Sequence, residues 1–276
     1  MRMTFFRNLE EAISLKLPLG VYCKLANVRN RIRKKKQHLT PFRAHSIYKV
    51  EDGTDHIYIC RRRRHNRYKR GVVAGVAELA KTYHLPLIPI QPKSVIIDCG
   101  ANVGELGLWA RQNGMDYIAF EPENLEADCV DLNAFDGAAQ THRKALWHSD
   151  TTLTFYSKPD TADSSVIDMG DSVVTTSIDA VALDGAVDLS IYDGTIVLKV
   201  EAEGAEPEVL AGAKETLLKA HYVVIDCGYE RGVEKRHTFV ESHSILSAAG
   251  FDLKAAFLRE GRMLYAKKGL PCGQVS

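Results

Sequence analysis

A glycine loop directly after a predicted buried strand is the clearest chemical signal in the sequence. Residues 95–104 read Val-Ile-Ile-Asp-Cys-Gly-Ala-Asn-Val-Gly. Gly100 can take the positive φ that a tight turn needs and lets a ligand approach the backbone, and Gly104 lets the next helix pack closely on the strand. In a doubly wound sheet the ligand site lies beyond the carboxyl ends of the strands, where this loop falls. We therefore expect this loop to line a ligand site.

Glu121 ends the next predicted strand, 21 residues beyond Gly100. A carboxylate at that place can accept hydrogen bonds from two ribose hydroxyls. The spacing is not the dinucleotide fingerprint, because the glycines run Asp-x-Gly-x-x-x-Gly and no third glycine follows in register. Glu121 alone would be a surface acid at a strand end, but the loop and Glu121 together predict a nucleoside ligand.

A parallel sheet is needed to position these residues. From about residue 93, strand, loop and helix alternate, which is typical of a sheet with helices on both faces. We predict strands at 95–99, 117–121, 139–146, 196–201, 222–227, 251–257 and 262–267, the last one antiparallel, and helices near 104–113, 123–134, 207–219 and 238–249. Residues 151–180 interrupt the alternation and predict extra strands or a lid over the sheet.

The chain is predicted to divide into an appendage, residues 1–65, and a main domain, residues 66–276. Apolar residues at Phe5, Leu9, Ile13 and Leu17 have helical spacing. Two short alternating segments, 46–50 and 56–60, flank a turn-rich loop and predict a β-hairpin. A helix within 68–83 is expected to lead into the main domain.

Composition excludes several classes of protein. The 276 residues are 45% hydrophobic with a mean hydropathy of −0.17, which is neither disordered nor collagen-like. No apolar run approaches the ~18 residues of a membrane span, and the first residues do not resemble a signal peptide. We therefore expect a cytoplasmic protein, with peripheral association to the inner face of the membrane as an open alternative. The six cysteines lie far apart, which argues against a disulfide framework or a zinc site.

The motifs taken together resemble the FkbM-type family of S-adenosylmethionine-dependent methyltransferases. The resemblance depends on Asp-Cys-Gly-Ala-Asn-Val-Gly at 98–104, Phe-Glu-Pro at 120–122 and Leu-Lys-Val-Glu-Ala-Glu-Gly-Ala-Glu at 198–206. Supporting segments lie at 144–146, 175–179, 209–213 and 226–232, so it covers about residues 66–268. One departure is Glu201, which stands where the family usually has aspartate in Lys-x-Asp-x-Glu-Gly.

The resemblance implies a fold, a cofactor and a class of reaction. The fold is an α/β, Rossmann-like, seven-stranded methyltransferase sheet with helices on both faces, carrying the basic helical and hairpin appendage. The cofactor is S-adenosylmethionine, and many members O-methylate sugars or natural products. Cofactor-binding residues are then expected at Asp98, Gly100, Ala101, Asn102, Gly104, Glu121 and Ala145.

Methyl transfer from a sulfonium to a hydroxyl is an in-line displacement, so the protein must align the two reactants and exclude water. A hydroxyl is a poor nucleophile at neutral pH, and a general base within hydrogen-bond reach should help. Lys199, Glu201 and Glu203 would share one face if their strand continued. We expect Glu203 to be the base, with Glu201 also a candidate and Lys199 either catalytic or an ion-pair partner. His142 and His148 are weaker candidates.

A divalent cation is the less favoured alternative to a metal-free mechanism. Glu201 with Asp226 could hold such an ion, since oxygen ligands suit magnesium, and it would polarise the acceptor hydroxyl. We therefore assign no metal ligands.

The formal net charge of +1 hides two oppositely charged parts. Residues 1–70 hold 19 Lys and Arg against 5 Asp and Glu, a charge of +14, and the remainder carries −13. The basic clusters at 29–36 and 61–70 predict an anionic partner, namely an anionic membrane surface, an acidic polysaccharide or nucleic acid. A solvated basic face that balances the acidic domain is the alternative.

The sequence thus favours an S-adenosylmethionine-dependent O-methyltransferase that acts on a sugar hydroxyl of a surface polysaccharide or lipid-linked glycan. Two alternatives remain open: an O-methyltransferase for a small natural product, and a nucleic-acid-binding protein with a methyltransferase-like scaffold. The intact glycine loop and Glu121 disfavour the scaffold. The oligomeric state is not predicted.

Overall fold

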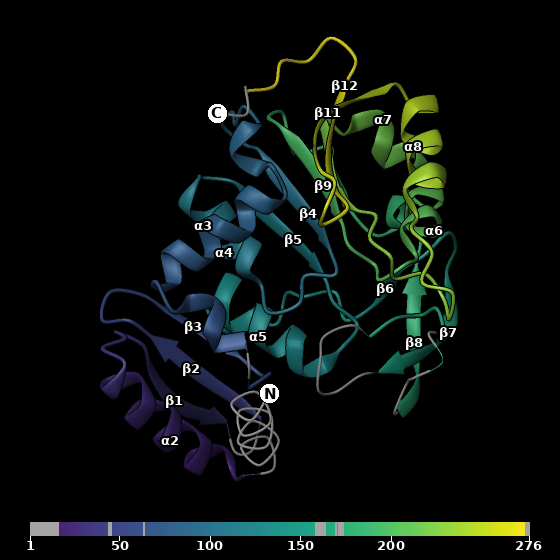
Figure 1. Cartoon of the computed structure of the whole chain (residues 1–276). Helices are drawn as coiled ribbons and strands as arrows, with labels where there is room; N and C mark the ends of the chain where they lie inside the picture. The colour runs from purple at the N-terminus through teal and green to yellow at the C-terminus, as the bar shows by residue number, and fades with distance from the viewer. Residues whose placement is uncertain are drawn as a thin grey trace. The chain divides into compact units, whose positions relative to one another are not determined.

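The structure is a computed structural model that describes residues 17–43, 46–62, 64–157, 164–168, 170 and 174–273. The chain divides into two units, Met1–Ala77 and Glu78–Ser276 (Figure 1). The division falls inside helix α3 (Val72–Thr82), beyond the boundary at residue 65 that the sequence suggests. The helix predicted around Phe5, Leu9 and Ile13 lies outside the described residues.

The described residues of the first unit form a small antiparallel sheet with helix α2 (Leu19–Ile32) packed against it. Strands β2 (Ile47–Glu51) and β3 (His56–Ile59) confirm the predicted hairpin. A strand that we did not predict, β1 (His38–Arg43), pairs with β2 at the edge of this sheet, where Pro41 is tolerated because an edge strand has unpaired amides. Helix α2 (Leu19–Ile32) buries Leu19, Tyr22, Cys23, Ala26 and Asn30. The short 3₁₀ helix η1 (Arg64–Tyr68) precedes α3.

A six-stranded sheet forms the centre of the second unit (Figure 1). Its order is β11-β12-β10-β9-β4-β5, where β10, β9, β4 and β5 are parallel and β12 is antiparallel to both neighbours, as predicted. The strands are β4 (Val95–Cys99), β5 (Asp116–Phe120), β9 (Ile196–Val200), β10 (Tyr222–Asp226), β11 (Phe251–Phe257) and β12 (Arg262–Lys267). All six lie within a residue of the predicted bounds.

The segment predicted as a strand at 139–146 is largely irregular. It touches the central sheet through one parallel bridge, between His142 and Phe120, and only β6 (Ala145–Leu146) is extended further on. Its early residues are polar, and Asp131 fixes them by accepting hydrogen bonds from the amides of Gln140 and Thr141. A second sheet, β6-β8-β7, holds β7 (Thr151–Ser157) and β8 (Val174–Val181), which confirms extra strands within 151–180.

Helices cover both faces of the central sheet, with α4 and α5 on one side and α6, α7 and α8 on the other (Figure 1). They are α4 (Glu105–Gln112), α5 (Asn124–Ala134), α6 (Glu206–Ala211), α7 (Lys214–Lys219) and α8 (Phe239–Ala248), with 3₁₀ turns η2 (Leu85–Leu87) and η3 (Leu183–Gly185). The single helix predicted at 207–219 is split at Gly212, where a Cβ would lie 2.0 Å from the Trp147 carbonyl oxygen. No helix of the described ranges is both long and apolar enough to cross a membrane.

Side-chain alternation gives the two faces of the sheet different chemistry. Odd-numbered residues of β4, such as Ile97, join the main apolar core with Leu198 of β9 and Val223 of β10. The opposite face carries Asp98 of β4 and Lys199 of β9, both buried and paired in register. The carboxyl ends of these strands therefore hold charged groups inside the protein.

Candidate active site

The glycine loop after β4 has the conformation that the sequence predicts. Gly100 has a φ of +74°, and a Cβ there would lie 2.2 Å from the Glu201 carbonyl oxygen, so no other residue fits without movement. Gly104 has a φ of +80°, and its Cβ would lie 3.1 Å from Cα of Val130 on α5. The first glycine thus brings the β4 loop against the end of β9, and the second brings it against a helix.

Glu121 lies next to this loop at the end of β5. It is buried, and its Oε2 accepts a hydrogen bond from the Asn102 amide at 2.8 Å while Oε1 accepts one from the Glu123 amide at 2.9 Å. The pKa of Glu121 is raised to about 8, mainly because the group is buried. The nearby Glu126 also raises this pKa, whereas the two amide hydrogen bonds lower it. Glu121 therefore connects the loop to β5, and its carboxyl group can gain or lose a proton near neutral pH.

The loop retains acceptor atoms that a nucleoside could use. The Gly100 and Ala101 amides both donate to the Phe120 carbonyl, so these amides are occupied by the protein itself. Oδ1 of Asn102 is buried and has no hydrogen-bond partner among the described residues. A buried acceptor without a donor is costly unless a ligand or water supplies one. The loop thus offers side-chain acceptors beside Glu121 rather than a nest of amides.

A buried ammonium group joins β4 to β9. Nζ of Lys199 lies 2.9 Å from Oδ1 of Asp98 and 3.2 Å from Oε2 of Glu201, and it donates to the carbonyls of Cys99 (3.0 Å) and Gly100 (2.7 Å). Burial lowers the pKa of Lys199, but the two carboxylates more than offset this and raise it above its ordinary value. Lys199 is therefore a permanent cation that holds the start of the glycine loop, which matches the ion-pair interpretation of this residue.

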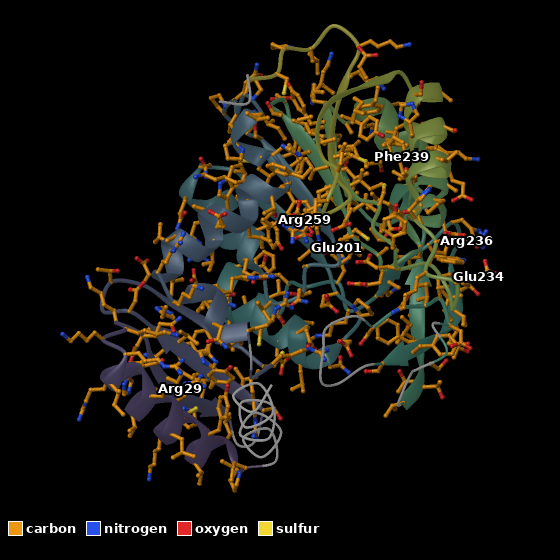
Figure 2. All side chains as sticks on the ribbon, in the orientation of Figure 1. Arg29, Glu201, Glu234, Arg236, Phe239 and Arg259 are labelled. Atoms are coloured by element: carbon orange, nitrogen blue, oxygen red, sulfur yellow. The ribbon has the colours of Figure 1, made fainter. Side chains whose placement is uncertain are left out.

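Arg262 extends the ion pairs to β10 and β12, and sequence reasoning missed it. Its Nε donates to Oδ2 of Asp226 at 2.8 Å, and Nη2 lies 3.4 Å from Oε1 of Glu201. Asp226 and Arg262 are register partners on antiparallel strands, which a single sequence does not reveal. The side chains thus alternate in charge from Asp98 through Lys199, Glu201 and Arg262 to Asp226. We call these five ion-paired side chains the ion chain. Glu201, its middle member, is labelled in Figure 2.

Tyr83 is a second residue that sequence reasoning missed. Its ring lies 4.4 Å from the Arg262 guanidinium carbon and 5.5 Å from Nζ of Lys199, which is cation–π geometry. Thr82 also accepts a hydrogen bond from Nη1 of Arg262 at 2.6 Å. The chain before β4 therefore covers the ion chain with an aromatic ring. The only signal in the sequence was an apolar helix that ends beside a tyrosine.

The ion chain makes Glu201 a poor candidate for a general base or a metal ligand. Burial raises its pKa, but Lys199 and Arg262 outweigh this and hold it at about 2, which makes Glu201 a weak base. Arg262 lies between Glu201 and Asp226, the two carboxylates proposed to share a divalent cation. The Arg262 guanidinium thus pairs with both carboxylates in place of a divalent cation. Among the described residues, no group of three or more His, Cys, Asp or Glu side chains is placed to hold a metal ion.

Glu203 does not extend the face of β9. The strand ends at Val200, and Glu203 has a φ of +50° in the turn that follows, so the predicted alternation stops at Glu201. Glu206 shapes this turn, because its buried carboxylate accepts hydrogen bonds from the amides of Ala202 (2.9 Å) and Gly204 (3.1 Å). Ser165 donates to the Glu203 carbonyl at 2.8 Å. Glu203 is therefore presented by a braced turn rather than by a strand.

The remaining predicted residues take supporting positions. Ala145 is buried in β6, within the second sheet. His142 stacks on Phe120 at 4.5 Å, and its carbonyl accepts a hydrogen bond from the Glu121 amide, so it helps to fix the end of β5. His148 contacts Trp147 and is exposed.

The doubly wound sheet, the glycine loop and a buried acid at the end of the next strand are features of a Rossmann-like domain. A family model described as the methyltransferase FkbM domain matches residues 98–253, which is more than half of the chain. The chain therefore belongs to the FkbM methyltransferase family.

Solved structures with a similar fold are distant in sequence. The methyltransferase FkbM from Methylobacillus flagellatus KT is 19% identical, with a TM-score of 0.44, over 70% of this chain and 50% of that one. The magnesium protoporphyrin IX methyltransferase of Synechocystis PCC 6803, solved with bound SAH, is 12% identical, with a TM-score of 0.37, over 74% and 86% of the two chains. This chain thus spans half the length of the first relative. No curated protein matches the sequence.

Proposed function

We propose that the chain is an S-adenosylmethionine-dependent O-methyltransferase that acts on a sugar hydroxyl of a surface polysaccharide or lipid-linked glycan. Membership of the FkbM family supports methyl transfer. The observation that supports the cofactor most directly is Glu121, a buried carboxyl group that already binds the Asn102 amide of the glycine loop. The sugar acceptor is inferred from the family resemblance in the sequence.

The residues around the loop fit this cofactor. Glu121 would accept hydrogen bonds from the ribose hydroxyls, and Oδ1 of Asn102 is a second buried acceptor. Gly100 allows the loop to turn with a positive φ and to pack against the Glu201 carbonyl, which places Asn102 beside Glu121. Asp98 fixes the start of the loop through Lys199, and Gly104 allows the loop to pack on α5. When bound, S-adenosylmethionine supplies a methyl group on a positively charged sulfur, which is activated for displacement.

Glu203 is the residue that we propose as general base. It lies beyond the end of β9, at the carboxyl edge of the sheet where the loop residues also lie. Lys199 and Arg262 keep Glu201 ionised by lowering its pKa, so Glu201 is a weak base. The turn that carries Glu203 is fixed by Glu206, which keeps the backbone of this residue in one place relative to β9. Its task is to accept the proton of the acceptor hydroxyl as the carbon–oxygen bond forms.

Calorimetric titration of the purified chain tests the cofactor. We expect S-adenosylmethionine and its demethylated product to bind, and NAD, a control for the glycine loop, not to bind. Binding of NAD instead, or no binding by a folded sample, would contradict the proposal.

Acceptors are then screened with a labelled methyl donor. The proposal expects label in purified surface polysaccharides or lipid-linked oligosaccharides. Label in small hydroxylated natural products alone would replace the glycan by that class and leave the cofactor assignment intact.

A further inference from the structure

Helix α2 carries an apolar stripe on its outer surface, away from its buried face. Val21, Leu25, Val28 and Ile32 are 43%, 55%, 59% and 77% exposed. At 3.6 residues per turn these four positions fall within an arc of about 60°. The residues that α2 buries lie on another side of the helix. We call these four side chains the α2 stripe, and exposed apolar residues aligned in this way indicate a docking surface.

Basic side chains border the stripe on both sides. Lys24 and Arg31 fall on one side by helical geometry and Arg29 on the other, and all three are exposed. Figure 2 labels Arg29 on this helix. Residues 17–36 contain seven Lys and Arg and no Asp or Glu. The surface is therefore apolar along its centre and cationic along its borders.

We propose that the α2 stripe and its basic borders dock the protein on the surface of an anionic lipid bilayer. Such a helix lies in the plane of the interface, with its apolar side chains among the acyl chains and its cations at the lipid headgroups. The cationic borders match anionic headgroups in charge. A polysaccharide or nucleic acid would use the cations but would leave four apolar side chains in water.

Docking also explains why the apolar residues are placed as they are. The buried face of α2 keeps the helix attached to its own sheet, so the stripe is presented as a preformed element and does not have to fold on the membrane. A single short helix of this kind binds reversibly, and its attraction to lipid depends on both apolar area and charge. The two contributions are therefore separable by substitution.

Vesicle co-sedimentation of the full chain tests the proposal. We expect binding to phosphatidylcholine vesicles that contain about one third phosphatidylglycerol, and at least about tenfold weaker binding to phosphatidylcholine alone. A stripe variant, with Val21, Leu25, Val28 and Ile32 all changed to Gln, should bind the anionic vesicles at least about tenfold more weakly. Gln is chosen because it retains high helix propensity.

Matched controls separate the stripe from general surface effects. The variant Leu218→Gln with Val240→Gln removes two exposed apolar residues from helices of the other unit and should bind like the unmodified chain. Replacing Lys24, Arg29 and Arg31 by Gln should weaken binding by about tenfold or more and reduce its salt dependence. Replacing the exposed Lys214, Lys219 and Lys268 by Gln should change it little.

Insertion into the bilayer is tested separately, so that a misfolded stripe variant does not decide the question. Ile32→Trp adds one indole to the stripe, and brominated lipids should quench its emission more than that of the unmodified chain. Equal quenching would overturn the proposal.

Three other results would also overturn the proposal. One is vesicle binding that the Gln stripe variant leaves unchanged. Another is tight binding to heparin or an RNA oligonucleotide, equal in the stripe variant, without binding to vesicles. The last is a dimer in sedimentation velocity that the stripe variant converts to monomer, since a second copy of the chain would then cover the stripe.

Discussion

Glu121 makes two structural contacts with the carboxyl group that we propose as the ligand of the ribose. Its oxygens bind the Asn102 and Glu123 amides, which fixes the loop against β5 before any cofactor arrives. Burial keeps its pKa near 8, so the group is mostly protonated at neutral pH. A ribose that donates hydrogen bonds to the carboxylate favours the charged form. Cofactor binding and ionisation of Glu121 should therefore be linked.

The linkage predicts how cofactor affinity depends on pH. Because the complex favours the carboxylate, affinity should rise with pH by up to about tenfold per unit below pH 8 and level off above it, with proton release near pH 7. Calorimetry from pH 6 to pH 9, in buffers of different ionisation enthalpy, measures both quantities. Glu121→Gln should bind more weakly, by about 1–3 kcal/mol relative to the ionised site, and lose the pH dependence. A flat profile for the unmodified chain would remove Glu121 from the cofactor site.

Glu203 and Glu201 should respond differently to the same substitution. Glu203→Gln removes the proposed base, so we expect kcat to fall by about 10²–10⁴-fold with unchanged cofactor affinity. Glu201→Gln removes the anion between Lys199 and Arg262, so a lower melting temperature should accompany any loss of rate. Steady-state kinetics and thermal unfolding of both variants measure the contrast. Full activity of Glu203→Gln would contradict the assignment of Glu203 as the base and direct the search to His142 and His148.

At the scale of the elements, periodicity and glycine spacing predict most of the second unit. An apolar run before a glycine locates β4, and the Asp-x-Gly-x-x-x-Gly spacing predicts a loop whose Gly100 has a positive φ. The features that the sequence does not predict depend on contacts between segments that are distant in the sequence. Arg262 meets Asp226 through strand register, and the Trp147 carbonyl lies where a side chain at Gly212, between α6 and α7, would be. The end of β9 at Val200 depends on Glu206, whose side chain binds the turn that follows.

Two glycines with positive φ offer a matched test of the loop. At Gly114 (φ +67°) nothing lies within 4 Å of an added Cβ, so Gly114→Ala should lower the free energy of unfolding by only about 1–2 kcal/mol. At Gly100 the Cβ also meets the Glu201 carbonyl, so Gly100→Ala should cost about 2–5 kcal/mol and abolish cofactor binding. Urea unfolding and calorimetry measure both. Equal costs at the two positions would show that the loop moves freely away from β9.

Two lysines in ion pairs differ in burial and provide a second matched test. Lys199→Met leaves Asp98 and Glu201 without their cation inside the protein, so we expect a loss of about 3–5 kcal/mol in the free energy of unfolding. Lys93→Met breaks an exposed pair with Asp193 and should leave stability nearly unchanged. Chemical denaturation measures the difference. A small effect at Lys199 would mean that its ammonium group does not hold the two strands together.

At the scale of the whole molecule, the two units differ in charge and in the chemistry they present. The first residues carry the excess of positive charge, whereas all the predicted site residues lie in the second unit. The residues that sequence reasoning missed, Tyr83 and Arg262, also belong to this unit. The ability to bind cofactor should therefore reside in the second unit with α3.

Truncation tests this division. A fragment of residues 66–276 keeps α3 and Tyr83, and we expect its cofactor affinity to stay within about threefold of that of the full chain, because all the proposed cofactor-binding residues remain. A fragment beginning at Lys93 loses Tyr83 and the Thr82 contact to Arg262, so its melting temperature should be clearly lower. Calorimetry and thermal unfolding compare the two. Loss of cofactor binding in the longer fragment would show that the site needs residues 1–65.

The contact between Gly100 and the Glu201 carbonyl bears on any attempt to redirect this protein to a new acceptor. A library that randomised residues 201–206 would also shift the Glu201 carbonyl against which the glycine loop packs. Many variants in the library would then lose activity because they no longer bind the cofactor, even where they bind the new acceptor. Directed evolution should therefore leave Lys199 and Glu201 unchanged and place diversity in the segments after β10 and between β11 and β12.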